Sequence, residues 1–271
     1  MIDSSRDLTR IAFDTIKNQI LITDLKDKSI KKVTLNGQEI FSESNGNINF
    51  QSPYSICINS LNEICVYDWH LNSLFLFDEN SEQVSELNLN NYFKNGKKLV
   101  NFMTFDPQNP SFLYFTNTSE NKVTLVDVKH KKFLDEKHLD SPYDIKLDNK
   151  NIYLTSSTSY SYDSVIKRIG KIVTGSNCIF ILNKRNFQPV RTIKHPNWTK
   201  PKGLHVDCNG FIWTTAFKND DVDVLNLFIL NQNGEIINSI RLNFKVFSDF
   251  FLIEHKIFFC AGNSLRLIKF D

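Results

Sequence analysis

Short runs of alternating apolar and polar residues fill this chain, and each run ends at a turn. The stretch from Ser52 to Leu87 shows the pattern most clearly, since Tyr54, Ile56 and Ile58 alternate with polar residues before the next turn. Alternation with period two, bounded by Asn, Asp, Ser and Pro, predicts β-strands. No window keeps the spacing of an amphipathic helix. The stretch therefore predicts four short antiparallel strands, the size of one propeller blade.

The same unit recurs along the whole chain. Its most regular mark is the end of the third strand, where an apolar residue is followed by Asp or Asn and then by a turn. This mark occurs at Leu35-Asn36, Phe77-Asp78, Val126-Asp127, Leu182-Asn183, Leu230-Asn231 and Phe270-Asp271. Successive marks lie 40 to 56 residues apart, a spacing typical of propeller blades. Six marks predict an all-β, six-bladed β-propeller with four-stranded antiparallel blades.

The predicted blades use almost the entire sequence. Their approximate ranges are 8–44, 53–90, 98–139, 142–194, 201–243 and 247–271. All-β folds of this length are routinely one domain, so we expect a single propeller domain over residues 1–271. The sixth blade contains three predicted strands, and a strand from residues 1–7 would have to complete it. Because those residues form a poor strand pattern, we expect this chain to be the C-terminal part of a longer protein.

Several blade positions resemble the NHL repeat, in which Pro opens a blade, Asp closes the second strand and Asn precedes the third. The matching residues are Pro53, Asp68, Asn72 and Asp78, then Pro142, Asp148 and Asn177, then Pro201, Gly203, Asp207, Gly210 and Asn231. The resemblance implies an NHL-type propeller like the C-terminal domain of tripartite-motif proteins. Such domains bind RNA or select protein substrates for ubiquitin transfer. RING or B-box cysteine spacing is absent from these residues, so no ligase activity is assigned to them.

Cysteine usage and hydropathy favour a cytoplasmic protein. The five cysteines are scattered over four predicted blades without a Cys-x-x-Cys motif, and four of them fall within strand runs as small buried thiols. No apolar run approaches the roughly 18 residues of a membrane span. We therefore expect reduced thiols and no membrane partner, and the sequence leaves the oligomeric state open.

Positive charge gathers in one part of the chain. No acidic residue occurs from Ser164 to Val206, although the net charge is only +2. In a propeller, loops joining second to third strands share one face with the connections between blades. The insert 156–176 and the connection 194–202 would therefore meet over the fourth and fifth blades. The predicted ligand-binding residues are Lys167, Arg168, Lys171, Lys194, His195, Trp198, Lys200 and Lys202.

This composition suits a nucleic acid or a protein partner. Lys and Arg neutralise phosphates, and bases stack on aromatic rings, for which Trp198, Tyr160 and Tyr162 are the candidates. Acidic residues at Asp220, Asp221 and Asp223 in the neighbouring loop favour a protein partner instead. A solvated charged face without a ligand remains the alternative. The predicted function is non-catalytic recognition of RNA or protein through this face.

The sequence gives little support for a catalytic activity. Metal-dependent lactonases are also six-bladed propellers, and their sequences carry an Asp after a blade-opening Pro, where this chain has Lys202 in one blade and Asp144 in another. Amidating-lyase propellers use three His around zinc, but only His205 falls in a predicted first strand here. Nucleophile and phosphate-loop motifs are absent. We expect no catalytic residues, no metal site and no cofactor, with a lactonase-like hydrolase as the less favoured alternative.

Overall fold

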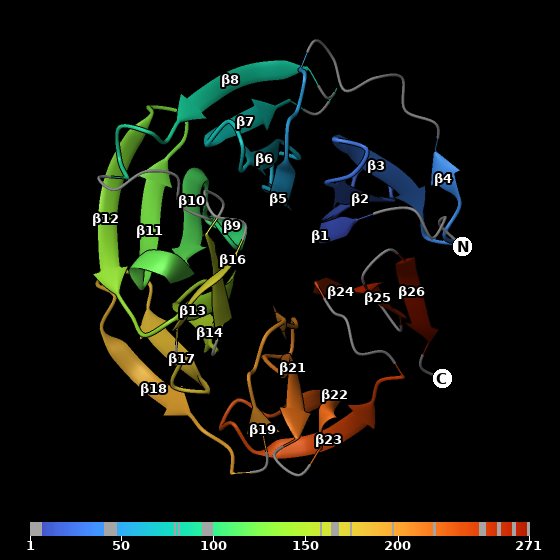
Figure 1. Cartoon of the computed structure of the whole chain (residues 1–271), viewed down its shortest axis with the longest axis vertical. Coiled ribbons are helices and arrows are strands. Elements are labelled where there is room, and N and C mark those ends of the chain that lie inside the picture. The colour runs from blue at the N-terminus through green and yellow to red at the C-terminus, as the bar shows by residue number, and fades with distance from the viewer. Residues whose placement is uncertain are drawn as a thin grey trace. The chain divides into compact units, whose positions relative to one another are not determined.

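The structure is a computed structural model of the chain, drawn in Figure 1. The residues that it describes are 7–40, 48–78, 80, 82–93, 100–157, 159–163, 168–173, 175–196, 198–218, 221–243, 248–253, 256–261 and 264–269. They are almost entirely β-strand and turn, with one short 3-10 helix, η1 (Thr118–Glu120). The predicted all-β class is confirmed.

The described strands form six small antiparallel sheets in the arrangement of a six-bladed β-propeller, plus one separate hairpin. The first sheet contains β1 (Leu8–Asp14), β2 (Gln19–Asp24), β3 (Ser29–Thr34) and β4 (Glu39–Ile40); the second contains β5 (Pro53–Ile58), β6 (Ile64–Asp68), β7 (Ser73–Phe77) and β8 (Gln83–Asn88). The third contains β9 (Met103–Asp106), β10 (Asn109–Asn117), β11 (Lys122–Asp127) and β12 (Lys132–His138). Each sheet runs in sequence order, as expected for hairpin-connected blades.

The fourth sheet contains β13 (Pro142–Leu147), β14 (Asn151–Ser156), β17 (Cys178–Asn183) and β18 (Pro189–Ile193), while β15 (Ser159–Asp163) and β16 (Arg168–Val173) pair as the separate hairpin. The fifth contains β19 (Trp198–Thr199), β20 (Leu204–Val206), β21 (Ile212–Lys218), β22 (Asp221–Leu230) and β23 (Ile236–Arg241). Its first strand is split, because both β19 and β20 pair with β21. The sixth contains β24 (Asp249–Ile253), β25 (Lys256–Ala261) and β26 (Ser264–Lys269).

Two compact units make up the chain. The first holds residues 1–113, 127–132 and 246–271, and the second holds 114–126 and 133–245, so the boundary runs through the third sheet. Buried apolar residues fill the spaces between neighbouring sheets in each unit. In the first unit one cluster joins the first and second sheets and another joins the first and sixth. In the second unit a cluster joins the fourth and fifth sheets.

Asp and Asn side chains build the turns. At the turn between first and second strands, Oδ1 of Asp14, Asn59, Asp106, Asp148 and Asp207 each accepts a bond from the N–H two residues later. At the ends of third strands, Asp78, Asn183 and Asn231 do the same, and Asp127 accepts from the N–H three residues later. These Asx turns explain why the repeat was visible as an apolar residue followed by Asp or Asn. The last predicted mark, at residues 270 and 271, lies outside the described residues.

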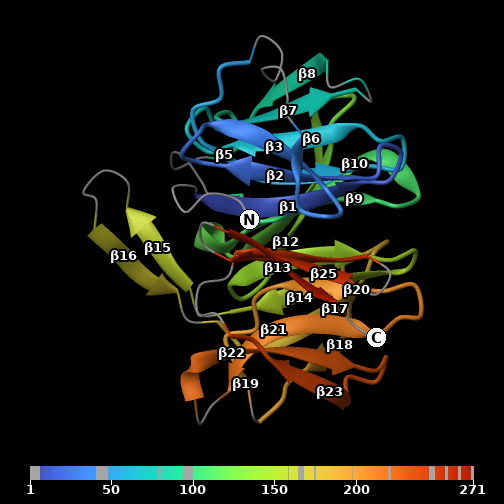
Figure 2. The same ribbon diagram turned by 90° about the vertical axis from the view of Figure 1, so that its right-hand side faces the viewer.

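The first and last sheets meet within the first unit, where β24 lies beside β1 (Figures 1 and 2). The Ile11 N–H donates to Asp249 Oδ2 at 3.1 Å, across 238 positions of sequence, and the rings of Phe13 and Phe251 lie 5.8 Å apart. Three strands of the sixth sheet are described, at the predicted positions. A strand from residues 1–7 would have to complete the sixth sheet. Residues 1–6 lie outside the described residues, and Asp7 is described and directly precedes β1.

Candidate functional site

A hairpin is inserted into the fourth sheet without disturbing it. The ladder between β14 and β17 runs in unbroken register from Asn151 opposite Asn183 to Ser156 opposite Cys178. The chain leaves this ladder after Ser156, forms the β15–β16 hairpin and returns at Cys178. Figure 2 shows the hairpin standing clear of the sheet that carries it. The second sheet makes the same connection with four residues, from Trp69 to Asn72, so the insert is additional to what the blade needs.

The base of the hairpin is fixed by hydrogen bonds to both neighbouring connections. The Ser141 hydroxyl donates to the Ser157 carbonyl at 2.6 Å, and the Lys200 N–H donates to Asn177 Oδ1 at 3.1 Å. The Ser176 hydroxyl also bonds the Asp140 carboxylate. The backbones of Ser157 and Gly175 approach so closely that a Cβ on Gly175 would clash with the Ser157 carbonyl carbon. The base of the insert is therefore held by several bonds, and at Asn177 it contacts the connection to the fifth sheet.

The predicted ligand-binding residues fall on these two segments, with one exception outside the described part. Lys167 lies outside the described residues, and Arg168 and Lys171 belong to β16. On the connection, Lys194 is exposed, whereas His195, Lys200 and Lys202 are half-buried. The Lys202 Nζ lies 5.8 Å from the centre of the Phe217 ring.

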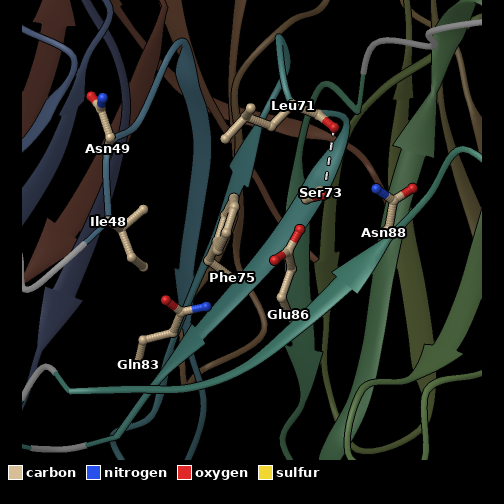
Figure 3. Close-up of a pocket in the computed structure, with 8 residues that line it drawn as sticks. All are labelled: Ile48, Asn49, Leu71, Ser73, Phe75, Gln83, Glu86 and Asn88. Carbon is tan, nitrogen blue, oxygen red and sulfur yellow. Dashed lines mark hydrogen bonds between the residues drawn. The ribbon is translucent and has the colours of Figure 1, made fainter.

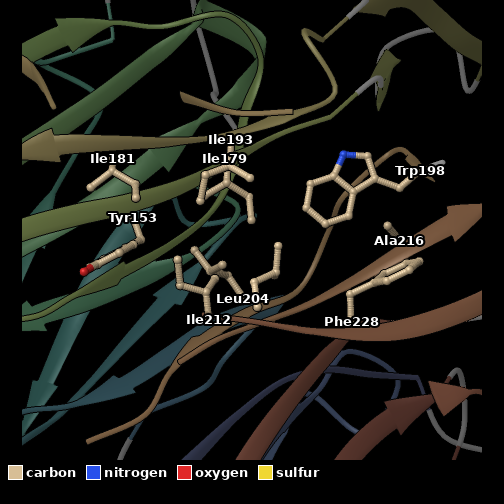
Figure 4. Close-up of a cluster of buried hydrophobic side chains, with 10 residues drawn as sticks. Tyr153, Ile179, Ile181, Ile193, Trp198, Leu204, Ile212, Ala216 and Phe228 are labelled. Atoms are coloured by element: carbon tan, nitrogen blue, oxygen red, sulfur yellow. The ribbon is translucent and has the colours of Figure 1, made fainter. Parts of the chain in front are cut away.

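Trp198 is a core residue and not an exposed stacking platform. Its side chain is 2% exposed and packs in the apolar cluster between the fourth and fifth sheets, as Figure 4 shows. The Phe228 ring meets it edge-on at 5.6 Å, and the His195 ring lies 5.7 Å away. Because the faces of the indole are covered, a nucleic acid base cannot stack there. The prediction for Trp198 is wrong because a short strand, β19, pairs it opposite Lys218 and turns the ring inward.

First-strand carboxylates join neighbouring sheets. In the second unit Asp144 Oδ2 accepts the Leu204 N–H of the fifth sheet at 2.7 Å, and its Oδ1 accepts the Ile145 N–H at 2.6 Å. In the first unit Asp249 plays the same part toward Ile11, with the Phe250 N–H on its second oxygen at 2.8 Å. Both carboxylates are almost fully buried. Their oxygens bind backbone amides, so the two groups hold blades together.

Arg10 occupies the corresponding place on β1. Its side chain is 2% exposed, and it donates from Nε to the Asn101 carbonyl at 2.9 Å and from Nη1 to the carbonyls of Thr9 and Ser248. The guanidinium carbon lies 3.8 Å from the centre of the Phe102 ring. Arg10 thus links the first sheet to the segments that lead into β9 and β24, within the first unit. Arg10 is not among the site residues predicted from the sequence, although a lone cation within the strand run of β1 was a visible signal.

The residues present do not fit a divalent-metal site in the described part of the chain. There, no three His, Cys, Asp or Glu side chains gather closely enough to hold an ion. His205 lies on β20, and its pKa is lowered to about 4, because burial and then the charge of Lys146 disfavour the imidazolium. Cys57, Cys65, Cys178 and Cys260 are free and buried as predicted, and Cys208 is free and exposed.

A groove lies on the second sheet, in the first unit. Its volume is about 360 Å³, within the range of small-ligand sites. The lining residues are Ile48, Asn49, Leu71, Ser73, Phe75, Gln83, Glu86 and Asn88. Figure 3 shows Ile48, on the segment before β5, across the groove from Phe75 of β7. Nothing in the sequence pattern predicted it, because it depends on how that segment crosses the sheet.

The fold has counterparts among solved structures. A gluconolactonase from Xanthomonas campestris superposes with a TM-score of 0.69 at 11% identity, over 99% of this chain and 87% of that one. The WD40 β-propeller domain of Doa1 gives 0.64 at 15% identity, over 96% and 77%, and a protein of unknown function from Bacteroides caccae gives 0.63 at 12%, over 89% and 83%. At such identities the likeness shows the fold alone. No protein-family model and no curated protein sequence matches this chain.

The chain is therefore a six-bladed β-propeller, and a fold of this kind does not by itself fix a function. Within the described part of the chain, no helix is both long and apolar enough to cross a membrane.

Proposed function

We propose that this propeller is a non-catalytic recognition module that binds a protein partner through the β15–β16 hairpin and the adjoining connection 194–202. The observation that carries the proposal is the insert itself, which leaves and rejoins an intact ladder and stands on a base fixed by hydrogen bonds. A segment that adds nothing to the pairing of its blade is typical of a functional loop on a rigid scaffold. The Doa1 propeller supports an interaction role by analogy of fold.

The charge of the two segments favours an acidic partner surface. The stretch 164–206 holds no Asp or Glu, and six of its nine Lys and Arg fall on the insert or on the connection. Asp163, on β15, is an acidic residue of the hairpin, and Lys194 on the connection is exposed. Opposite potentials speed association and suppress wrong partners, an effect that weakens with added salt. We infer that the partner presents Asp and Glu side chains to this sector.

A precise deletion tests the proposal. Because Ser157 and Gly175 nearly touch, residues 158–174 can be replaced by the two-residue turn Asn-Gly while the β14–β17 ladder is kept. We expect the shortened chain to keep its circular-dichroism spectrum and melting behaviour and to lose the proteins that crosslink to the intact chain in source cells. Unchanged crosslinking would overturn the proposal.

The matched control for this deletion is Arg185→Glu. Arg185 is exposed in the turn between β17 and β18, at the opposite end of β17 from the insert. We expect this charge reversal to leave the captured proteins unchanged, which separates a local surface from a general charge effect.

RNA is the second candidate ligand, favoured by the same run of cations. Each phosphate contact adds to the salt dependence of binding, so affinity should fall steeply between low and physiological salt. Arg168→Glu combined with Lys200→Glu should abolish RNA binding, and ribonuclease should remove it from crosslinked material. Binding that ignores salt and the double reversal would eliminate this candidate. The buried position of Trp198 weighs against it.

We further propose that the domain is of the NHL type, works in the cytoplasm and forms the C-terminal part of a longer tripartite-motif-like protein. The NHL type is supported by the placement of Asn72, Asn121 and Asn177, each in the left-handed conformation immediately before a third strand. The ligase alternative, in which the propeller selects substrates for a RING outside these residues, follows from that resemblance. This alternative predicts that the proteins crosslinked to the propeller are enriched in ubiquitinated forms, which ubiquitin blotting of the captured material would measure.

A less favoured alternative is that this chain is a hydrolase, since its fold is similar to that of the Xanthomonas gluconolactonase. Asp144 and Asp249, the first-strand carboxylates described above, bind backbone amides with both oxygens. Arg10 places a buried cation on β1, the first strand of the first sheet. This arrangement supports a structural role for both acids. Stoichiometric calcium or zinc in the purified protein, together with lactone hydrolysis, would favour the enzyme instead.

A further inference from the structure

We propose that the groove on the second sheet binds an arginine side chain of an extended peptide. This is a second binding site, separate in residues from the hairpin surface and independent of the function proposed above. Its residues belong to the first unit, on β7, β8 and the segment that precedes β5.

The floor of the groove is apolar and firmly held. Phe75 is 5% exposed and meets the Phe50 ring edge-on, with the ring centres 5.7 Å apart, and Ile48 and Leu71 pack against the same cluster. Side chains locked by packing give a pre-formed site with little ordering cost on binding. Such a floor suits the aliphatic stem of a long cationic side chain, which buries its methylenes while its head stays polar.

A β-bulge directs polar groups over this floor. Ser73 lies opposite Asn88 and Phe75 lies opposite Glu86, so these four side chains share one face of the sheet. The register then shifts, because Leu76 pairs with Ser85 whereas Phe77 pairs with Gln83. Bulges re-aim side chains next to binding sites. Here the bulge brings Gln83 to the groove, while Val84 is left 57% exposed.

The charge of the lining selects a cation. Among the eight described lining residues, Glu86 carries the sole charge, and Asn49, Gln83 and Asn88 add amide oxygens that can accept bonds. Figure 3 shows the Glu86 carboxylate on the same side as Phe75 and Ser73. A guanidinium offers five N–H donors in a planar fork that matches one carboxylate and neighbouring carbonyls, whereas an ammonium is a more strongly hydrated point charge. Arginine therefore fits this lining better than lysine does.

The test uses two short peptides and two variants of the full chain. The probe is acetyl-Gly-Arg-Gly-amide, and its control carries citrulline, which keeps the shape of arginine but has no charge. Titration calorimetry should show saturable binding of the arginine peptide and at least about tenfold weaker binding of the citrulline peptide, since hydrogen bonds to charged groups are the stronger ones. Glu86→Gln should weaken arginine binding by a similar factor.

Glu82→Gln is the matched control, because Glu82 is exposed one residue before β8 and does not line the groove. It should leave the affinity unchanged. Equal binding of the two peptides, equal effects of the two substitutions, or no saturable binding at millimolar peptide would each overturn the proposal. Protein partners captured through the hairpin should be unaffected by Glu86→Gln, so the two proposals fail separately.

Discussion

Single buried polar residues hold the sheets of this protein to one another. Asp144 and Asp249 each accept a backbone N–H of a neighbouring sheet, and Arg10 donates to the backbone just before the third sheet. Buried polar groups are stable only when their hydrogen bonds are made, and removing one member leaves the others unsatisfied. These positions are therefore sensitive to substitution although they touch no proposed ligand.

Arg10→Met should lower the free energy of unfolding by about 2–4 kcal/mol, because the carbonyls of Asn101 and Ser248 lose their charged donor inside the protein. Urea unfolding followed by tryptophan fluorescence measures this. The exposed Arg185→Met serves as control and should change stability by less than about 0.5 kcal/mol. Equal stability of the two variants would show that the Arg10 bonds contribute nothing net.

His205 makes stability depend on pH in a defined direction. Its pKa is about 4 in the folded protein and about 6.5 when unfolded, so the unfolded chain binds more protons between those values. Its contribution is complete above pH 6.5 and is lost as the pH falls toward 4. His205→Gln should therefore lose less stability between pH 7.5 and 4.5 than the natural chain does. The exposed His138→Gln should behave like the natural chain, and a matching loss in all three would contradict the assignment.

At the scale of the element, the sequence predicted the repeating parts and missed the irregular ones. The alternating runs and the Asp or Asn marks predicted the blades, because Asx side chains build many of the turns that end the strands. The sequence predicts a loop where the structure has the β15–β16 hairpin. It predicts a plain connection where the structure has β19, since a two-residue strand exists only through its pairing with β21. Tertiary pairing of that kind leaves no periodic pattern in sequence.

The Asn residues before third strands mark the repeat, and they also adopt the left-handed conformation that their turns require. Asn177 has φ of 49° and accepts the Lys200 N–H. Asn177→Gly keeps the left-handed conformation and removes the acceptor, so it should cost about 1 kcal/mol of unfolding free energy. Asn177→Ala should cost about 1 kcal/mol more, because of backbone strain.

Asn18 provides the control for this pair of variants. It has φ of 51° in the turn between β1 and β2, with an exposed side chain. Asn18→Gly should be close to neutral by urea unfolding. A loss equal to that of Asn177→Gly would mean that the bond to Lys200 is not the source of the effect.

At the scale of the molecule, strand order decides which loops share an end of a sheet. The sequence prediction of a shared surface over the fourth and fifth blades stays a prediction, and the bond between Asn177 and the Lys200 N–H is consistent with it. The charge pattern was less informative about burial. It placed Trp198 on the surface, because sequence cannot say which aromatic side chains a neighbouring sheet will cover. Arg10 and the groove on the second sheet escaped it for the same reason, since both depend on contacts between sheets.

The account depends most on the hairpin surface being the place where a partner binds. Hydrogen exchange, measured on the chain alone and with a partner captured by crosslinking, tests this directly. We expect slower exchange of backbone amides in 159–163, 168–173 and 194–202 when the partner is bound, with little change in β7 and β8. Protection confined to other strands, with the hairpin exchanging as fast as in the free chain, would contradict the account.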